Sequence, residues 1–484
     1  MDSGTGRDKH VGRPVPSLVQ TLALLLVQAP AQPVLRAAEG PTSVAAAAGD
    51  CAGGSCAPVD GAPRRAGPEV RGGAEPATGA VRLAGPPAEA AAAPVGVREV
   101  GGNLVAPEDA GRADADGGDP QAPWAVGGFV DTQYIVNSNS PDNHIFRGTS
   151  VSSRTGEFSP NLIVAYIRRD PVKSPWMFEL ALQAGAAADA LYYVEPVAGG
   201  ADGRFAGVET WKHIGKAWTG LKLKRGTEIA AGLMVAPTHF GSFWTKDNWH
   251  SSITWGYSSV PFFLTGARVY QPIGDKVGIG LWLVNGYGTM GDGNKAPSGL
   301  LNLVILPSAN WAIVNNLYVG PEDVELKPAA WRVLIDSQVV YNTERWGLAF
   351  VGDYGRERLT FKAGGPLTQW ANAMLSVRWH VLGKKHRWGM AARPELFWDR
   401  GGRIFNESDR DDYLVAGTFT NDLRLWDTLL LRVEYRYDHS FSQSGFFYRG
   451  AATSDTAMGL AHTQHSLIFN VIGYFERRFG KRRG

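Results

Sequence analysis

From Trp124 to Phe479 the chain consists of short runs in which apolar and polar residues alternate, separated by Gly, Asp, Asn and Pro. A period of two is typical of a β-strand with one apolar face, because successive side chains point to opposite sides. The turn residues mark where each strand ends. The pattern predicts sixteen strands, at 124–137, 161–169, 175–185, 212–223, 227–239, 261–273, 277–287, 298–307, 311–320, 330–342, 346–355, 370–382, 388–399, 413–426, 429–439 and 465–476.

The alternation assigns an environment to each face of a strand. In the strand at 429–439, Leu431 and Val433 share one face, while Arg432 and Glu434 share the other. Strands of a membrane barrel alternate in this way, with apolar side chains toward lipid and polar ones toward water. We therefore expect one lipid-facing and one water-facing side.

The connections between the predicted strands alternate in length. Short turns such as 427–428 are followed by long spacers such as 440–464. Outer-membrane barrels have short periplasmic turns and long extracellular loops. The sequence therefore predicts an all-β protein, a closed antiparallel transmembrane β-barrel of about 16 strands with both termini in the periplasm. The alternative is 14 strands, if 298–307 and 311–320 form only a hairpin within a loop.

Aromatic residues stand at both ends of the predicted strands. The residues at the ends next to the short turns are Trp124, Trp176, Trp311, Trp346 and Trp388. The residues at the opposite ends are Tyr134, Tyr318, Trp331, Tyr354, Trp370, Trp398 and Tyr413. Because Trp and Tyr favour membrane interfaces, these two sets predict an aromatic girdle at each membrane surface.

Composition favours membrane strands over membrane helices. Aromatic residues make up 11% of the chain and charged residues 19%, and the mean hydropathy is −0.16. No run of 18 apolar residues occurs, so a membrane crossing requires a closed barrel. The net charge is only +2, without a concentrated basic face, which excludes nucleic acid as a partner.

The chain divides into three parts. Residues 1–31 have the pattern of a signal peptide, with basic residues, an apolar stretch near 18–27 and the cleavage motif Ala-Pro-Ala at 29–31. Residues 32–122 are low-complexity Ala, Gly, Pro, Arg and Glu, a composition that predicts a disordered periplasmic linker. The barrel is expected to occupy 123–484.

Several motifs point to a known family. They are GGFVDTQY at 127–134, GLMVAPTHFGSFWTKDNWHSSITWGYSS at 232–259, PFFLTGARVYQPIGDKVGIGLWLVNGYG at 261–288, VGDYGRE at 351–357, PELFWDRGG at 394–402 and LLLRVEYRYDHSFSQSGFF at 429–447. With them, the stretch from Trp124 onward resembles the putative outer-membrane β-barrel porin type 2 family. The resemblance implies a barrel in the outer membrane of a Gram-negative bacterium that lets solutes pass, and it implies no catalytic residue.

The end of the chain departs from the usual pattern of outer-membrane strands, which finish on an aromatic residue. Here Tyr474 and Phe475 are followed by ERRFGKRRG. The signal for the barrel-assembly machinery, one of the expected partners, is therefore either displaced or extended to Phe479.

The charged residues of the polar faces are the candidate functional residues. The predicted pore-lining set is Asp131, Lys216, Lys222, Arg332, Asp336, Asp353, Arg378, Arg393, Glu395, Asp422, Arg424, Arg432, Glu434 and Arg436. Such charges orient hydrated solutes and set ion preference; the alternative is that they only neutralise one another. Eight are basic and six acidic, so we expect a modest preference for anions, with Arg432 and Arg436 contributing most from hydrated positions.

The spacer at 240–260 is the candidate constriction loop. Its aromatic residues are Phe243, Trp244, Trp249, Trp255 and Tyr257. A loop this apolar does not stay exposed to water without packing. We expect it to fold inward and narrow the barrel, while a contact between subunits of a homo-oligomer is the alternative.

These observations predict a porin that allows passive diffusion of small hydrophilic solutes or ions, with outer-membrane lipid as its surroundings. One alternative is an outer-membrane barrel hydrolase, suggested by His213, His239 and His380, although no trio has the spacing of a catalytic set. Another is a surface-binding structural barrel. The two cysteines, Cys51 and Cys56, lack metal-site spacing, and we expect no metal or cofactor.

The predicted linker yields a first test. Deleting 32–122 while keeping the signal peptide should leave a heat-modifiable barrel in the outer membrane, because the deleted composition supports no core. Electrophoresis of unheated and heated membrane samples measures this. Loss of the fast-migrating folded form would contradict the prediction.

Overall fold

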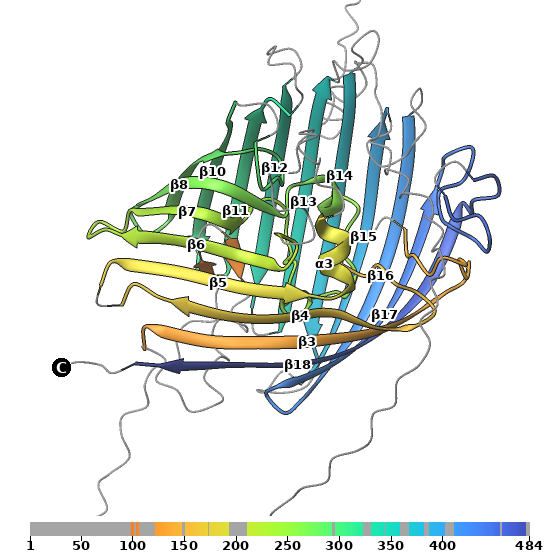
Figure 1. Ribbon diagram of the computed structural model, residues 1–484, viewed down its shortest axis with the longest axis horizontal. Coiled ribbons are helices and arrows are strands. Elements are labelled where there is room, and N and C mark those ends of the chain that lie inside the picture. Colours follow the sequence, from red (N-terminus) through yellow and green to blue (C-terminus); the bar gives the residue numbers. More distant parts are fainter. Residues whose placement is uncertain are drawn as a thin grey trace, which may run out of the picture. The chain divides into compact units, whose positions relative to one another are not determined.

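The structure of the protein is a computed structural model. It describes residues 98–100, 103–105, 122–147, 151–172, 174–192, 211–292, 296–322, 331–343, 345–358, 367–381, 387–401, 411–454 and 457–480. Sixteen antiparallel strands close into one barrel (Figure 1). Among the helices of these residues, none is long and apolar enough to cross a membrane.

The strands that form the barrel wall follow one another around it in chain order. They are β3 (Trp124–Asn137), β4 (Phe158–Arg169), β5 (Trp176–Ala184), β6 (Ile214–Lys222), β7 (Glu228–Val235), β8 (Phe263–Ile273), β9 (Val277–Val284), β10 (Ser298–Ser308), β11 (Trp311–Gly320), β12 (Arg332–Asn342), β13 (Trp346–Arg358), β14 (Leu367–His380), β15 (Trp388–Arg400), β16 (Asp411–Leu425), β17 (Leu429–Ser440) and β18 (Thr463–Phe479). The prediction of sixteen strands is confirmed. The alternative of 14 strands is wrong, because β10 and β11 both belong to the wall.

Closure removes every free edge from this sheet. The last strand, β18, pairs along its length with the first, β3, and β9 pairs with β10. In hydrocarbon an unpaired backbone N–H or C=O has no water to bond, so only a closed sheet can cross. Exposure alternates along the strands as the sequence predicts: in β9, Leu281 and Leu283 point outward and Trp282 points inward.

The girdle next to the short turns is present. Trp124, Trp176, Trp311, Trp346 and Trp388 are each the first residue of a strand. Aromatic rings contact one another around this end, as Trp346 and Trp379 do with centroids 5.7 Å apart. A belt of rings with polar N–H groups fits the membrane interface.

The predicted girdle at the opposite end is partly wrong. Tyr318, Trp370 and Trp398 are buried rather than exposed to lipid. Trp370 turns inward because Gly355 on the neighbouring strand leaves room for its ring; a Cβ there would lie 2.0 Å from a ring carbon. By contrast, Tyr413 is outward-facing and exposed, as expected.

The two ends of the barrel domain pack together. Strand β18 continues to Phe479, which pairs with Trp124, so the final strand does end on an aromatic residue. Ala122, expected in the linker, is buried, and its carbonyl accepts a hydrogen bond from Arg478. Within the predicted linker, β1 (Arg98–Val100) and β2 (Asn103–Val105) pair as a two-stranded sheet.

Some expectations fall outside the described residues, namely the signal peptide at 1–31 and the cysteines Cys51 and Cys56.

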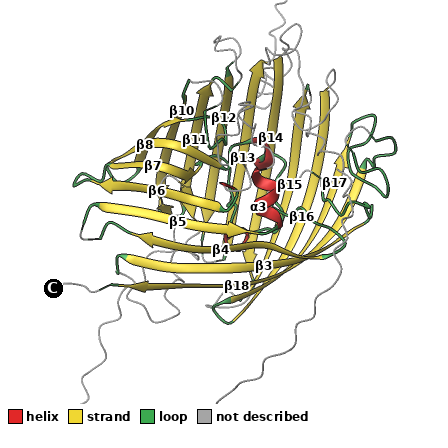
Figure 2. Ribbon diagram, in the orientation of Figure 1, coloured by secondary structure: helices red, strands yellow, loops and turns green. Residues whose placement is uncertain are grey.

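The long connections also hold a short helix, α3 (Ala186–Tyr192), after β5 (Figure 2). Its Ala187 and Ala188 are fully buried. The extracellular connections thus contribute packed structure as well as linking strands.

Two depths on the outer face of the wall predict different costs for the same substitution. Leu281→Arg, in the middle of β9 on its outer face, should destabilise the barrel by about 2–4 kcal/mol, because it puts a cation into hydrocarbon. Ile273→Arg, also outward-facing but next to the turn at 274–276, should cost about 0–1 kcal/mol near the interface. Urea unfolding in lipid vesicles measures both, and equal costs would show that these positions do not differ in depth.

Candidate functional site

The segment 236–262, which we call the inner loop, connects β7 to β8 and lies inside the barrel. It contains the 3-10 helices η1 (Thr245–Asp247) and η2 (Tyr257–Ser259). Its hydrogen-bond partners come from the inner faces of β3 and of β11 to β18. All five predicted aromatic residues are buried, namely Phe243, Trp244, Trp249, Trp255 and Tyr257. They pack within the barrel instead of forming an exposed surface for another subunit.

Carboxylates of the wall receive the backbone N–H groups of the inner loop. Glu434 on β17 accepts hydrogen bonds from the N–H of Ser251 at 2.6 Å and the N–H of Ser252 at 3.0 Å. Glu395 on β15 accepts from the N–H of Trp255. Hydrogen bonds to an ionised acceptor are stronger than neutral ones, so these two side chains hold the centre of the loop.

Arg432 on β17 binds the carbonyl groups of the same loop. Its guanidinium donates to the carbonyl oxygens of Thr245 at 3.0 Å, Asn248 at 2.5 Å and His250 at 3.1 Å. Asp422 on β16 pairs with it at 2.6 Å. The planar fork of an arginine can serve several acceptors at once, and here it ties three loop residues to one place on the wall.

Arg436 repeats this role four residues further along β17. It donates to the carbonyl oxygen of Ile253 at 2.6 Å and pairs with Asp438 at 2.8 Å. Arg432 is 1% exposed and Arg436 0%. The expectation that these two arginines stand in hydrated positions is therefore wrong, because the inner loop covers them and accepts hydrogen bonds from both.

The loop meets the other side of the wall through aromatic packing. Trp244 stacks on Tyr166 of β4 with centroids 5.2 Å apart. The Lys216 ammonium of β6 lies 3.9 Å from the Trp244 ring centroid and 3.0 Å from a Glu179 carboxylate oxygen. A cation over an indole face is attracted to it. On this side of the barrel, aromatic rings and a lysine ammonium contact the loop.

A glycine in the wall makes room for a second loop aromatic. The Trp249 ring lies over Gly347 of β13, where a Cβ would come within 2.5 Å of it. The Arg378 guanidinium on β14 lies 5.9 Å from the same ring. Any larger residue at 347 would force the loop away from the wall.

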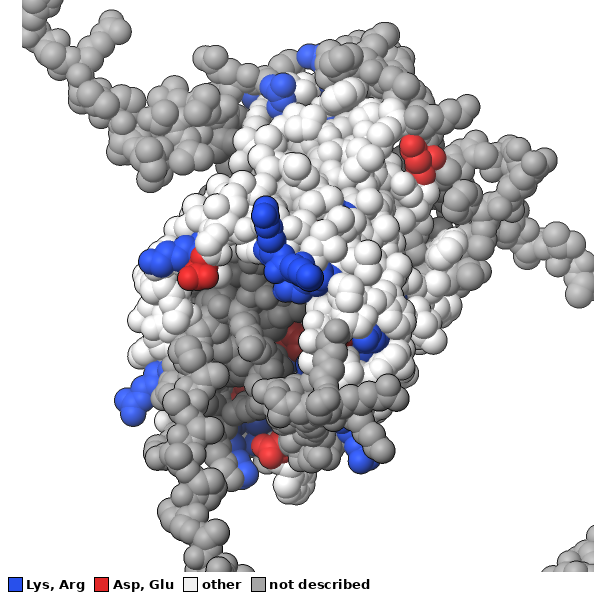
Figure 3. Space-filling view, turned by 90° about the vertical axis from the view of Figure 1, so that its left-hand side faces the viewer, with Lys and Arg blue, Asp and Glu red and all other residues white. Residues whose placement is uncertain are grey.

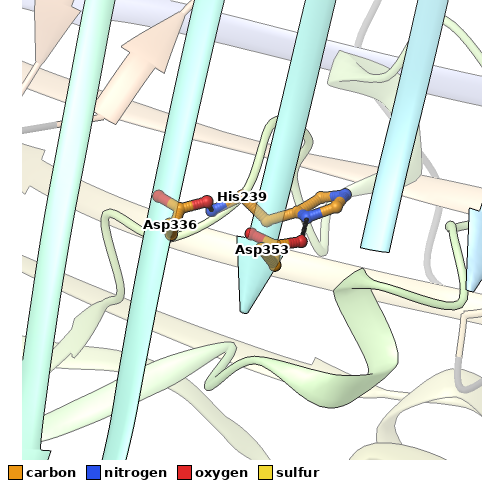
Figure 4. A group of neighbouring side chains, drawn as sticks. All are labelled: His239, Asp336 and Asp353. Carbon is orange, nitrogen blue, oxygen red and sulfur yellow. Dashed lines mark hydrogen bonds and ion pairs between the residues drawn. The ribbon is translucent and has the colours of Figure 1, made fainter. Parts of the chain in front are cut away.

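The first residues of the inner loop bind a pair of aspartates. The backbone N–H of His239 donates to Asp336 Oδ2 at 3.0 Å, and the ring nitrogen Nδ1 of His239 lies 2.8 Å from Asp353 Oδ2 (Figure 4). On the other side of the ring, His239 Nε2 lies 2.7 Å from Thr254 Oγ1. Burial lowers the pKa of His239 to about 4, so this imidazole is neutral at pH 7.

A second buried histidine lies at the centre of the loop. His250 Nδ1 lies 2.8 Å from Thr420 Oγ1 and Nε2 lies 2.9 Å from Ser376 Oγ. Burial, with smaller contributions from nearby arginines, holds the pKa of His250 well below its ordinary value. The ring is therefore a neutral hydrogen-bonding link between loop and wall.

The remaining predicted pore-lining residues also lie on the inner face. Arg393 on β15 donates to the Ser252 carbonyl oxygen at 2.9 Å and therefore also holds the inner loop. Lys222 is half-exposed and pairs with Glu228 at 2.9 Å. Arg332 makes an ion pair with a carboxylate of β13. Arg378 and Arg424 are buried. The structure thus brings most of the set onto one side of the lumen and leaves Lys216 and Lys222 on the other.

Sequence reasoning missed several residues that hold the inner loop. Asp438 accepts from Trp255 Nε1 at 3.0 Å, and the alternation along its strand could have found it. Asn470 accepts from the Ser251 hydroxyl at 2.5 Å. A neutral amide on a polar face carries no distinctive signal. The serines of the loop are also ordinary in sequence.

The histidines that suggested a hydrolase are apart from one another. His213 directly precedes β6, and its Nδ1 lies 3.1 Å from the Gln183 carbonyl oxygen. His380 ends β14 and is buried. His239 has the carboxylate of Asp353 and the hydroxyl of Thr254 as partners, and all three residues are buried.

Comparisons with known proteins give the family of the chain. A family model described as putative beta-barrel porin-2, OmpL-like, matches residues 123–472. No curated protein matches the chain. Similar solved structures include an anion-selective porin from Comamonas acidovorans (12% identity, 73% of this chain and 100% of that chain covered, TM-score 0.47). Others are the outer-membrane expressed OmpT of Vibrio cholerae (8%, 73% and 97%, TM-score 0.44) and the outer membrane channel DcaP of Acinetobacter baumannii (9%, 72% and 96%, TM-score 0.44). Since the family model extends from before the first strand of the barrel into its last, the protein belongs to the putative beta-barrel porin-2, OmpL-like family, and is a porin of the bacterial outer membrane.

Proposed function

We propose that the protein is a diffusion channel for small hydrophilic solutes or ions, narrowed by the docked inner loop. The observation that carries this proposal is the position of the loop, which is held inside a sixteen-stranded barrel by β3 and β11 to β18. A barrel of this size is wide enough for an aqueous channel unless a loop narrows it. The space for solutes then lies between the loop and the remaining strands.

Charged groups on that remaining side support a polar pathway. Lys216 is 18% exposed and Lys222 45%, and on the loop Lys246 is 18% exposed. In Figure 3, basic and acidic side chains surround a hollow in the face shown. Because these groups keep contact with water, they act on a passing solute more directly than the buried arginines do.

Their sign points to a modest preference for anions. The carboxylates beside Lys216 and Lys222, which are Glu179 and Glu228, are more buried than the lysines, whereas Asp247 beside Lys246 is about as exposed as that lysine. A partly exposed cation raises the local concentration of anions, by an amount that salt screens over a Debye length of about 10 Å at 0.1 M. The determinants of selectivity are then Lys216 and Lys222, in place of Arg432 and Arg436.

The anchoring of the loop can be weakened without leaving a lone buried charge. The double variant Arg432→Met with Asp422→Asn removes the guanidinium and neutralises its partner together. Hydrogen bonds to a charged group contribute about 1.5–3 kcal/mol each, so the loop should detach in part. Single-channel recordings in planar bilayers should show a larger conductance and a noisier open current.

A matched pair at the periplasmic end controls for general damage. Arg478 and Asp170 form an ion pair at 2.8 Å that does not contact the inner loop. Arg478→Met with Asp170→Asn should keep the conductance of the unmodified protein. Equal conductance in both double variants, each with an intact heat-modifiable barrel, would show that the loop does not narrow the channel.

Selectivity is tested by neutralising the partly exposed lysines. Lys216→Gln with Lys222→Gln should shift the reversal potential in a KCl gradient toward cation preference, because two positive charges leave the pathway. The shift should shrink at high salt. Lys276→Gln, at an exposed turn, is the control and should change nothing. An unmodified protein that favours K⁺ would contradict the proposed anion preference.

A further inference from the structure

Two carboxylates face each other beneath the stem of the inner loop. Asp336 on β12 and Asp353 on β13 are direct partners in the strand register, on the inner face. Their carboxyl groups lie within hydrogen-bond reach of one another, and both residues are at most 3% exposed. His239 completes the group, and one nitrogen or oxygen atom from each of the three residues lies within 4.8 Å of the others.

No Lys or Arg side chain among the described residues pairs with Asp336 or Asp353. Their partners are amides, a backbone N–H and the His239 imidazole. Asp353 Oδ1 is buried and receives no hydrogen bond from any described donor. Two carboxylates that lie in contact away from water require a cation or a proton between them.

The surrounding side chains hold the three residues in a fixed geometry. Asn316 and Gln338 donate to Asp336 Oδ1 at 2.5 and 2.9 Å. Asn372 donates to Asp353 Oδ2 at 3.2 Å. Second partners of this kind orient the ligands of a metal site and are usual around them.

The histidine can present a free nitrogen to the carboxylates. If the ring proton resides on Nε2, it is donated to Thr254 Oγ1, 2.7 Å away, and Nδ1 carries a lone pair toward the aspartates. A hydroxyl can accept as well as donate, so Thr254 fits either tautomer. Metal-bound histidines almost always donate their second ring N–H in this way.

We propose that His239, Asp336 and Asp353 bind a divalent first-row metal ion, zinc by donor preference, which fastens the inner loop to the wall. One imidazole and carboxylates are ligands that zinc accepts at about 2 Å, so tetrahedral ligand atoms lie about 3.3 Å apart. Nδ1 and Asp353 Oδ2 are 2.8 Å apart, and the ligand atoms of the three residues all lie within 4.8 Å of one another, a range that includes that spacing. The fourth position is left to water.

The position of the site explains what the ion does. His239 comes four residues after the end of β7, while Asp336 and Asp353 belong to strands on a different part of the wall. An ion shared by all three joins the stem of the loop to β12 and β13. Because the site is closed by the loop, the ion enters before or during docking.

The test is refolding of the full chain, without a histidine tag, in detergent with Zn²⁺ or with a chelator. After gel filtration, zinc measured by elemental analysis should be equimolar with the chain. The temperature at which the folded form is lost, followed by electrophoresis of samples heated in steps, should be several degrees higher for the zinc-loaded protein. Ca²⁺, which prefers oxygen ligands, should not replace zinc; if it does so equally well, the assignment of His239 as a ligand is wrong.

Variants distinguish this site from adventitious binding. His239→Gln and Asp353→Asn should each lose the bound zinc. Asp131→Asn is the matched control, since Asp131 is also a buried carboxylate that binds the inner loop, through Thr245 at 2.8 Å, but it has no imidazole beside it. This variant should keep its zinc.

Two outcomes would overturn the proposal. The first is an unmodified protein that folds without zinc and has the same thermal transition in chelator, which would mean that a shared proton bridges the two aspartates. The second is equimolar zinc in both Asp353→Asn and His239→Gln, which would place the ion elsewhere. Zinc content is measured independently of conductance, so either result leaves the proposed channel function to be decided by the bilayer recordings.

Discussion

The requirement that every backbone polar group be bonded within the bilayer governs this structure. Hydrocarbon supplies no partner for an open strand edge, and the pairing of β18 with β3 and of β9 with β10 removes each edge. Closure with sixteen strands encloses a lumen broad enough to admit a loop. The outward apolar residues, the inward polar residues and the room for the inner loop all follow from that closure.

Inside the lumen, charged side chains take the place of water for the inner loop. Glu434 and Glu395 accept its N–H groups, and Arg432 binds its carbonyl groups. Each of these charges also has a partner of opposite sign or several dipoles, which offsets the cost of its burial. The pair formed by Asp336 and Asp353 differs, because its hydrogen-bond partners among the described residues are amides, a backbone N–H and the His239 imidazole. That contrast is why we assign a cation to this place.

The errors of the sequence analysis have specific physical causes. Tyr318 and Trp370 were assigned to the girdle because they stand at strand ends, although the alternation from Trp311 and from Leu375 places both on the inner face. Arg432 and Arg436 were assigned to the correct face, but alternation cannot tell a face covered by a loop from one in water. The loop supplies that difference, and its contacts join residues far apart in the chain.

The sequence by itself determined the strands, their number, their faces and the inward course of the aromatic loop, because each depends on local periodicity or on the burial of apolar side chains. Only the tertiary structure decided which charges meet. Barrel closure brings Asp131 beside Asn470 and brings His239 to Asp336 and Asp353. Such partners lie tens to hundreds of residues apart in the chain. Their distances in space depend on the strand register and on the docking of the loop, and no local sequence pattern encodes either.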